Sequence, residues 1–397
     1  MSSTAIHPTH KMSGKSSARS NEWSLLLAAC SGSSGPDHLE SVRSLLRAPI
    51  DWKTLFQLAD HHRVLPLLYQ ALATVKAEVP AQEMQVLERH YQINLHKAMF
   101  LSRELIRITD RLSELGVEFL PYKGLALAQM MYGDVALRQS GDIDVLIRAA
   151  DLPRIRDAVQ ELGYSPHAPL SEAQQQAYLK SGYECAFDGP AGPNLLELQW
   201  AIQPKFYAVD FDMEGLFRRA VTVEVAGRAI KTPSLEDLFV VLCLHAAKHV
   251  WGRLVWTCDL ARLMQLPSLR WDLIGMQTRQ LRAVRIVRVT LALAQRFFGT
   301  SIPAAAGALP EDAEAPALSR EIEGYIDSQK LYDVESLAYF RLMLRLRENE
   351  ADRLRFLGRL AFTPGPGEWN AVRLPPSLFP LYRFVRIARL AARAVQR

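Results

Sequence analysis

A change of hydrophobic period between residues 101 and 147 constrains the fold of this chain more than any other feature. Apolar side chains first recur every three or four residues, which predicts an amphipathic helix over 101–115 that ends at Gly116. Two short β-rich runs follow, at 117–122 and 142–147, and the apolar run 125–132 between them predicts a helix. Strands and helices must therefore alternate in this part of the chain.

Similar patterns extend this unit in the C-terminal direction. A helix is expected over 152–162 and strands over 183–187 and 195–200, so that residues 116–232 form a small mixed sheet with helices. Helical patterns fill 23–115 and 233–397, whereas 1–22 has almost no apolar side chains and is expected to be a disordered leader. We predict an α+β fold, with a mixed-sheet core between N-terminal and C-terminal helical regions.

Composition restricts the class of protein without deciding its chemistry. The chain has 397 residues, of which 49% are apolar, and so can bury a sizeable core. A net charge of +5 is compatible with an anionic ligand but does not indicate nucleic acid as a partner. The four cysteines, Cys30, Cys185, Cys243 and Cys258, form no paired motif, which is typical of a reducing compartment and predicts a cytoplasmic protein.

Two segments raise the question of a membrane. The apolar run 23–30 follows basic residues and ends like a lipoprotein cleavage box, but it spans only about seven apolar residues, which favours the first helix of a soluble domain. Elsewhere no apolar stretch approaches the ~20 residues of a membrane span. The basic amphipathic segment 381–397 favours a terminal helix packed on its domain over a contact with an anionic membrane or nucleic acid.

Asp142 and Asp144 carry the first chemical signal. Because they lie two residues apart in an expected strand, both carboxylates are expected on the same face of the sheet. Two such charges repel one another unless a cation lies between them, and Mg²⁺ prefers oxygen ligands of this kind together with phosphate oxygens. A solvated edge strand is the alternative, since short Asp-x-Asp patterns also arise by chance.

Neighbouring residues supply groups that bind anions. Lys123 and Gly124 precede a helix N-terminus, where unpaired N–H groups favour phosphate and glycine permits its close approach. Arg138 and Ser140 place a guanidinium and a hydroxyl just before the aspartate pair. Glu197 becomes a third carboxylate if its strand lies beside that of the aspartates. A solvated turn lysine and a surface ion pair are the alternatives for the two basic residues.

The run 121–147 resembles the signature of bacterial nucleotidyltransferases related to DNA polymerase β. It is most similar to a poorly characterised family with a Lys-Gly turn, an Arg-x-x-x-Asp-x-Asp segment and a His-x-x-x-His helix. Here these are Lys123-Gly124, 138–144 and 245–249. The chain departs from the pattern twice, because Leu125 replaces the usual Gly or Ser of the turn and Glu197 replaces the usual Asp.

The resemblance implies that an acceptor hydroxyl attacks the α-phosphorus of a nucleoside triphosphate in line and releases pyrophosphate. Two Mg²⁺ or Mn²⁺ ions would be held by Asp142, Asp144 and Glu197, with Glu197 completing the metal site or accepting the proton. The residues expected to contact the nucleotide phosphates are Lys123, Gly124, Arg138, Ser140 and Lys248. The acceptor is left open among a protein, a peptide and a small molecule.

Two other classes of function remain. A protein that keeps the fold for binding alone, such as an antitoxin-like regulator, is favoured by Leu125 at the phosphate turn. A metal-dependent hydrolase is the other, because His245 and His249 lie on one helix face and Asp259 could be a third ligand. We expect Trp256 nearby to pack rather than to stack on a base.

Overall fold

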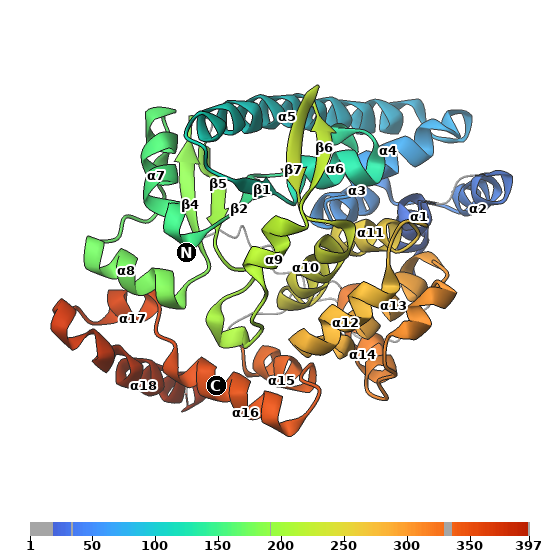
Figure 1. Cartoon of the computed structure of the whole chain (residues 1–397). Helices are drawn as coiled ribbons and strands as arrows, with labels where there is room; N and C mark the ends of the chain where they lie inside the picture. The colour runs from blue at the N-terminus through green and yellow to red at the C-terminus, as the bar shows by residue number, and fades with distance from the viewer. Residues whose placement is uncertain (1–18, 33–34, 191, 329–335, 396–397) are drawn as a thin grey trace.

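The computed structural model describes residues 19–32, 35–190, 192–328 and 336–395 (Figure 1). It is an α+β protein, as predicted, in which a mixed sheet is surrounded by helices. Most of the expected leader, residues 1–18, lies outside the described residues. The first helix begins at Asn21, where the Ser20 hydroxyl accepts a hydrogen bond from the backbone N–H of Trp23.

Five helices precede the sheet. They are α1 (Asn21–Cys30), α2 (Pro36–Leu46), α3 (Trp52–His61), α4 (Leu65–Ala73) and α5 (Ala81–Glu114), with a 3-10 turn at Lys76–Glu78 before the last. The helix expected over 101–115 is the C-terminal part of α5, which lies across the sheet (Figure 1). Its Leu101, Leu105, Ile108 and Leu112 are buried in the hydrophobic cluster that includes the sheet. The regular apolar spacing therefore reflects one buried face, as expected.

The main sheet has five strands in the order β1-β2-β5-β4-β3. Its strands are β1 (Phe119–Pro121), β2 (Ile143–Ile147), β3 (Ser165–Pro166), β4 (Glu184–Gly189) and β5 (Gly192–Gln199). The β2 and β5 strands run parallel and the other pairs antiparallel, with Asp144 directly opposite Glu197. The two acidic strands are therefore neighbours, which was the condition for a three-carboxylate set.

Helices α6 (Gly124–Tyr132) and α7 (Leu152–Glu161) connect these strands where the sequence predicted them, and a 3-10 turn at Val135–Leu137 follows α6. The sequence analysis missed α8 (Glu172–Ser181) and a separate hairpin of β6 (Val221–Val225) and β7 (Arg228–Thr232). Both turn residues of this hairpin, Ala226 and Gly227, have positive φ, the geometry of a two-residue hairpin turn.

The rest of the described chain is helical. The helices are α9 (Met213–Arg218), α10 (Leu235–Lys248), α11 (Leu254–Leu263), α12 (Trp271–Leu281), α13 (Val284–Phe298), α14 (Ala315–Asp327), α15 (Leu337–Arg345), α16 (Glu350–Phe362), α17 (Pro366–Ala371) and α18 (Tyr382–Val395). None of the described helices is both long and apolar enough to cross a membrane. The N-terminal and C-terminal helices share one hydrophobic cluster, to which α1 and α13 both contribute.

Two arginines of helix α18, Arg386 and Arg389, are not solvated as the packed-helix interpretation of 381–397 implied. The guanidinium groups of Arg386 and Arg389 turn toward the protein and pair with Glu368 of α17. The apolar side chains of Phe384 and Ile387 are instead exposed, to 67% and 38%. The buried carboxylate of Glu368 explains this orientation, because it would otherwise be left without a counter-charge.

Candidate active site

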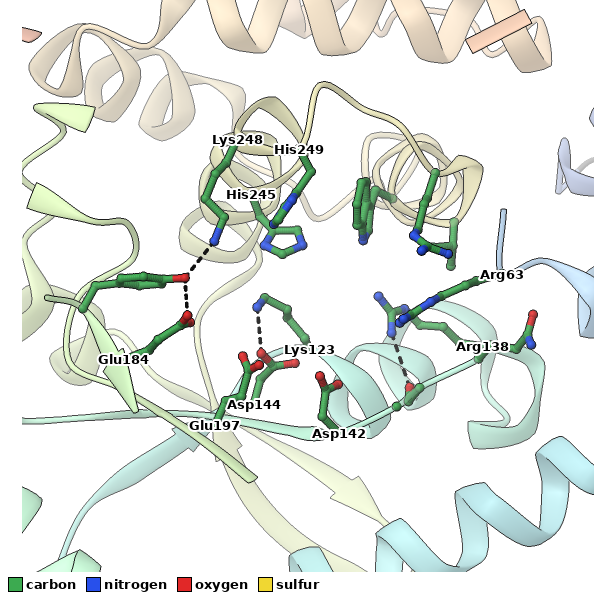
Figure 2. Close-up of a pocket in the computed structure, with 17 residues that line it drawn as sticks. Arg63, Lys123, Arg138, Asp142, Asp144, Glu184, Glu197, His245, Lys248 and His249 are labelled. Carbon is green, nitrogen blue, oxygen red and sulfur yellow. Dashed lines mark hydrogen bonds and ion pairs between the residues drawn. The ribbon is translucent and has the colours of Figure 1, made fainter. Parts of the chain in front are cut away.

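A pocket of about 370 Å³ lies between the sheet and the ends of α10 and α11 (Figure 2). Charged side chains dominate its lining. The cations are Arg63, Lys123, Arg138, Lys248 and Arg253, and the carboxylates are Asp142, Asp144, Glu184 and Glu197. All the residues that the sequence assigned to metal or nucleotide, except Gly124, therefore line one pocket, and Gly124 lies beside it.

The turn before α6 needs its glycine. Gly124 has φ +54°, and a Cβ atom there would lie 3.4 Å from the carbonyl oxygen of Asp142 and 3.7 Å from Oγ of Ser140. The first residue of α6 is thus held against the segment that leads into β2. This contact places the helix N-terminus and the Ser140 hydroxyl together, as a phosphate seat requires.

Leu125 does not face this seat. Its side chain is 3% exposed and belongs to the hydrophobic cluster of the sheet, together with Ala126 and Ile143. The leucine therefore contributes to the core and does not block the turn. A hydroxyl lies beside the turn all the same, because Ser140 Oγ of the neighbouring loop is 3.7 Å from the Cβ position of Gly124.

The carboxylates crowd together at the edge of the pocket. Asp144 is 6% exposed, and the Nε2 group of Gln199 donates to Asp144 Oδ1 at 3.3 Å and to Glu197 Oε2 at 3.0 Å. Burial and the charge of Asp144 raise the pKa of Asp142 to about 6 and that of Glu197 to about 8. Both shifts disfavour the ionised carboxylates in the metal-free protein, so a cation bound among them would favour their charged forms.

Lys123 now supplies the cation nearest to this cluster. Its Nζ lies 2.7 Å from Asp144 Oδ1, and, against the effect of burial, this carboxylate raises the pKa of Lys123 well above its ordinary value. As the side chains stand, no three His, Cys, Asp or Glu side chains among the described residues are grouped so as to hold a metal ion. Carboxylate oxygens are donors that fit Mg²⁺, provided that Lys123 moves away from Asp144.

Arg138 forms an ion pair with Asp259, the residue that the hydrolase interpretation used as a third metal ligand. Its Nε lies 3.0 Å from Asp259 Oδ2, and both residues are buried. The Tyr132 hydroxyl also donates to Asp259 Oδ1, at 2.8 Å. Asp259 is therefore occupied by a guanidinium and a phenol, and it cannot be the third ligand of a metal at the two histidines.

His245, His249 and Trp256 form an aromatic group on the opposite wall of the pocket. The two imidazole centroids lie 4.8 Å apart, and each lies just over 5 Å from the Trp256 ring. Burial lowers the pKa of His249 to about 3 and that of His245 well below its ordinary value, so both rings are neutral near pH 7. The histidines pack with Trp256, as expected for its role, although all three side chains also line the pocket.

Lys248 lies beside Glu184 and Tyr183. Its Nζ donates to the Tyr183 hydroxyl at 3.1 Å, and that hydroxyl donates in turn to the Glu184 carboxylate. Glu184 also accepts a hydrogen bond from Gln199 Nε2 at 3.3 Å. These bonds connect Lys248, through Tyr183, Glu184 and Gln199, to the carboxylates of Asp144 and Glu197, on the side of the pocket away from Arg63 (Figure 2).

Arg63 and Arg253 are pocket residues that the sequence analysis missed. One guanidinium nitrogen of Arg63 lies 3.9 Å from the position that a Cβ atom of Gly141 would occupy. Arg253 donates to the backbone carbonyl oxygen of His61 at 2.7 Å, and burial together with the charge of Arg63 lowers its pKa. Within the described part of the chain, neither arginine forms an ion pair with a carboxylate.

The comparisons with known proteins agree with this geometry. A family model described as an uncharacterised nucleotidyltransferase matches residues 48–299, which is well over half of the chain. The chain belongs to this nucleotidyltransferase family. No curated protein and no solved structure matches it. The match begins before Arg63 and ends after Trp256, so that it contains every residue that lines the pocket.

No local pattern could have revealed the two missed arginines. Arg63 lies between α3 and α4, and Arg253 lies just before α11, far in the sequence from the Lys-Gly turn. Arginines are common on protein surfaces, and the spacing of these two carries no periodic signal. Only the packing of both helical regions against the sheet brings them to the pocket.

Proposed function

We propose that this nucleotidyltransferase moves a nucleoside monophosphate from a nucleoside triphosphate to a hydroxyl group of an acceptor, with Mg²⁺ or Mn²⁺ as its cofactor. The observation that carries the proposal is the set of three crowded carboxylates, Asp142, Asp144 and Glu197, beside the Gly124 turn. Their raised pKa values indicate a site that gains from a divalent cation. Bound Mg²⁺ would supply Lewis-acid activation of the α-phosphate and charge neutralisation.

The charges that line the pocket indicate on which side of the aspartates the triphosphate binds. Among the described residues that line the pocket, Arg63 and Arg253 are the arginines without an ion pair to a carboxylate, and Arg63 lies on the side of Asp142 away from Glu184 and Lys248 (Figure 2). Ser140 and the N-terminus of α6 lie together at the Gly124 turn. We assign the β- and γ-phosphates to the side of Arg63, because unpaired guanidinium groups bind phosphate strongly. Arg138 also lines the pocket and contributes positive charge toward the phosphates, while its ion pair with Asp259 fixes its position.

The reaction then proceeds by in-line displacement. The acceptor oxygen forms the new bond to the α-phosphorus while the bond to the bridging oxygen breaks, and pyrophosphate leaves with that electron pair. The acceptor proton passes to the carboxylate of Glu197. With a divalent cation at Asp144, Lys123 would give up its ion pair with that carboxylate and would be placed to contact the α-phosphate.

The branch of the family and the cellular location of the protein are parts of the same proposal. We assign it to the bacterial branch related to DNA polymerase β, on the Lys-Gly turn and the Asp-x-Asp strand. A cytoplasmic location is supported by cysteines that are all free in the structure, Cys30, Cys185, Cys243 and Cys258. The binding-only alternative loses its main support, because Leu125 packs into the core and leaves the phosphate turn open.

A label-transfer experiment tests the proposal. The purified protein is incubated with the four nucleoside triphosphates labelled at the α-phosphate, with Mg²⁺ or Mn²⁺ and a cell extract. We expect a transferred label that is lost in the Asp142→Asn, Asp144→Asn double variant and kept in Asp157→Asn, which changes an exposed aspartate of α7. Label transfer by the double variant at the wild-type rate would contradict the assigned site.

A further inference from the structure

The side of the pocket opposite the arginines has its own chemistry. An in-line displacement places the attacking oxygen opposite the leaving pyrophosphate, so the acceptor must approach from the side of Glu184 and Lys248 (Figure 2). This step rests on the proposed function. Neither residue belongs to the three-carboxylate set, and the transfer as described above leaves both without a role.

Glu184 and Lys248 present a fixed acceptor and a fixed donor of hydrogen bonds. The Glu184 carboxylate is oriented by the Tyr183 hydroxyl and by Gln199 Nε2, and a carboxylate can accept further hydrogen bonds. The Lys248 ammonium donates to Tyr183 at 3.1 Å and lies 4.8 Å from the centre of the Tyr183 ring. An ammonium group has three N–H donors, so two remain for a ligand.

Polar and charged groups surround this side of the pocket in the part of the chain that the structure describes, with the Tyr183 ring beneath the Lys248 ammonium. The apolar side chains that line the pocket, Val255 and Trp256, come from α11 beside Arg253. Gln199 Nε2 lies 3.3 Å from Glu184 Oε2 and 3.0 Å from Glu197 Oε2, so these two carboxylates are neighbours and would repel a phosphorylated or carboxylated acceptor. The ligand that complements this surface carries one hydroxyl that accepts from Lys248 and another polar hydrogen that is donated to Glu184.

We propose that the acceptor is a polyhydroxylated, non-anionic small molecule or group, such as a sugar-like polyol, and that Glu184 and Lys248 bind its hydroxyl groups next to the one that reacts. A polyanion such as a nucleic acid does not fit this subsite. Tyr183 acts as a positioning residue, because its hydroxyl bonds to both Glu184 and Lys248 and holds them in place without contacting the ligand itself.

Competing acceptors of matched size test this inference. The protein is incubated with Mg²⁺ and nucleoside triphosphates in the presence of glycerol, n-propanol or glycerol phosphate, and mass spectrometry measures the alcohol ester relative to the free monophosphate formed with water. Glycerol and n-propanol share a carbon skeleton and a primary hydroxyl. We expect glycerol to give the highest ratio and glycerol phosphate the lowest.

Two variants test whether a preference for glycerol depends on Glu184 and Lys248. Glu184→Gln and Lys248→Met should each lower the ester-to-monophosphate ratio for glycerol by about tenfold, since each removes a charge-assisted hydrogen bond. Glu88→Gln, which changes an exposed carboxylate of α5, should leave the ratio unchanged. A ratio is used because a variant that folds poorly loses both products together.

The outcomes separate the two proposals. If wild-type protein releases monophosphate but forms esters of glycerol and n-propanol equally, or prefers glycerol phosphate, the polyol inference is wrong while nucleotidyl transfer stands. An undiminished glycerol ratio in both variants would also overturn it. If neither monophosphate nor ester forms with any nucleotide, the proposed function itself fails.

Discussion

Asp142 and Glu197 determine how the metal-free protein should respond to pH. Their pKa values in the fold, about 6 and about 8, lie above their ordinary values of 3.8 and 4.5. The folded state therefore binds more protons than the unfolded state, and its stability should fall as pH rises through this range. Mg²⁺ should reverse the loss, because a cation favours the charged carboxylates.

Thermal unfolding at several pH values, with and without Mg²⁺, measures this effect. We predict that the rise in melting temperature caused by Mg²⁺ grows between pH 6 and pH 8. A variant with Asp142→Asn and Glu197→Gln should gain little from Mg²⁺ at any pH. A gain that is equal at both ends of the range, or equal in the variant, would place the metal elsewhere.

Leu125 should matter for stability and not for the phosphate seat. Its side chain is buried in the sheet cluster, so that Leu125→Ser should lower the free energy of unfolding by about 2–5 kcal/mol through lost contacts and a buried hydroxyl. Denaturant titration measures this change, with Leu354→Ser on the exposed side of α16 as a matched control. Tighter binding of a nucleoside triphosphate to Leu125→Ser would contradict the placement of its side chain.

The loop before β2 and helix α11 are connected by the buried pair of Arg138 and Asp259. Removing one partner leaves the other charge buried, so Asp259→Asn should lower the free energy of unfolding by about 3 kcal/mol or more. Glu161→Gln breaks an exposed pair with Arg111 and should change it by no more than about 1 kcal/mol. Equal effects of the two variants in denaturant titrations would show that the pair is not buried.

The elements that hold the carboxylates could be predicted from the sequence, whereas several others could not. Alternation and β-branched side chains identified β2, β4 and β5, and helical spacing identified α6 and α7. The hairpin of β6 and β7 was missed although 221–232 alternates around Ala226-Gly227, a signal that a turn-based reading would have used. The two-residue β3 has no periodicity to detect.

The site could be predicted from the sequence only in part, because some of its residues are brought together by contacts between distant segments. Lys123, Asp142 and Asp144 fall within one local motif, and Glu197 of a distant strand could be added only on the condition that its strand lies beside that of the aspartates, which the structure meets. Glu184 and Arg63 reach the pocket only through tertiary packing, which no spacing in the chain encodes. The same packing places Lys248 beside Tyr183, on the side of Glu184, and its expected contact with the nucleotide phosphates stays a prediction.

The helical regions on either side of the sheet depend on one another. Buried side chains of α1, α3 and α4 share a hydrophobic cluster with those of α10 to α16. The boundaries expected after residues 22, 115 and 232 remain predictions. A truncated chain of residues 19–232 should expose the inner face of α1 and α4 and lose cooperative thermal unfolding. A sharp calorimetric transition of that chain would show instead that 19–232 folds by itself.

Arginines from both helical regions complete the pocket, so that the nucleotide should hold the parts of the molecule together. The most direct test is calorimetric binding of a non-hydrolysable nucleoside triphosphate in the presence of Mg²⁺. We predict binding by the wild-type protein that requires Mg²⁺ and weakens by at least about tenfold in Asp142→Asn, which removes a charged metal ligand. Equal binding without Mg²⁺, or equal binding by Asp142→Asn, would contradict a metal-dependent nucleotide site at the aspartate pair.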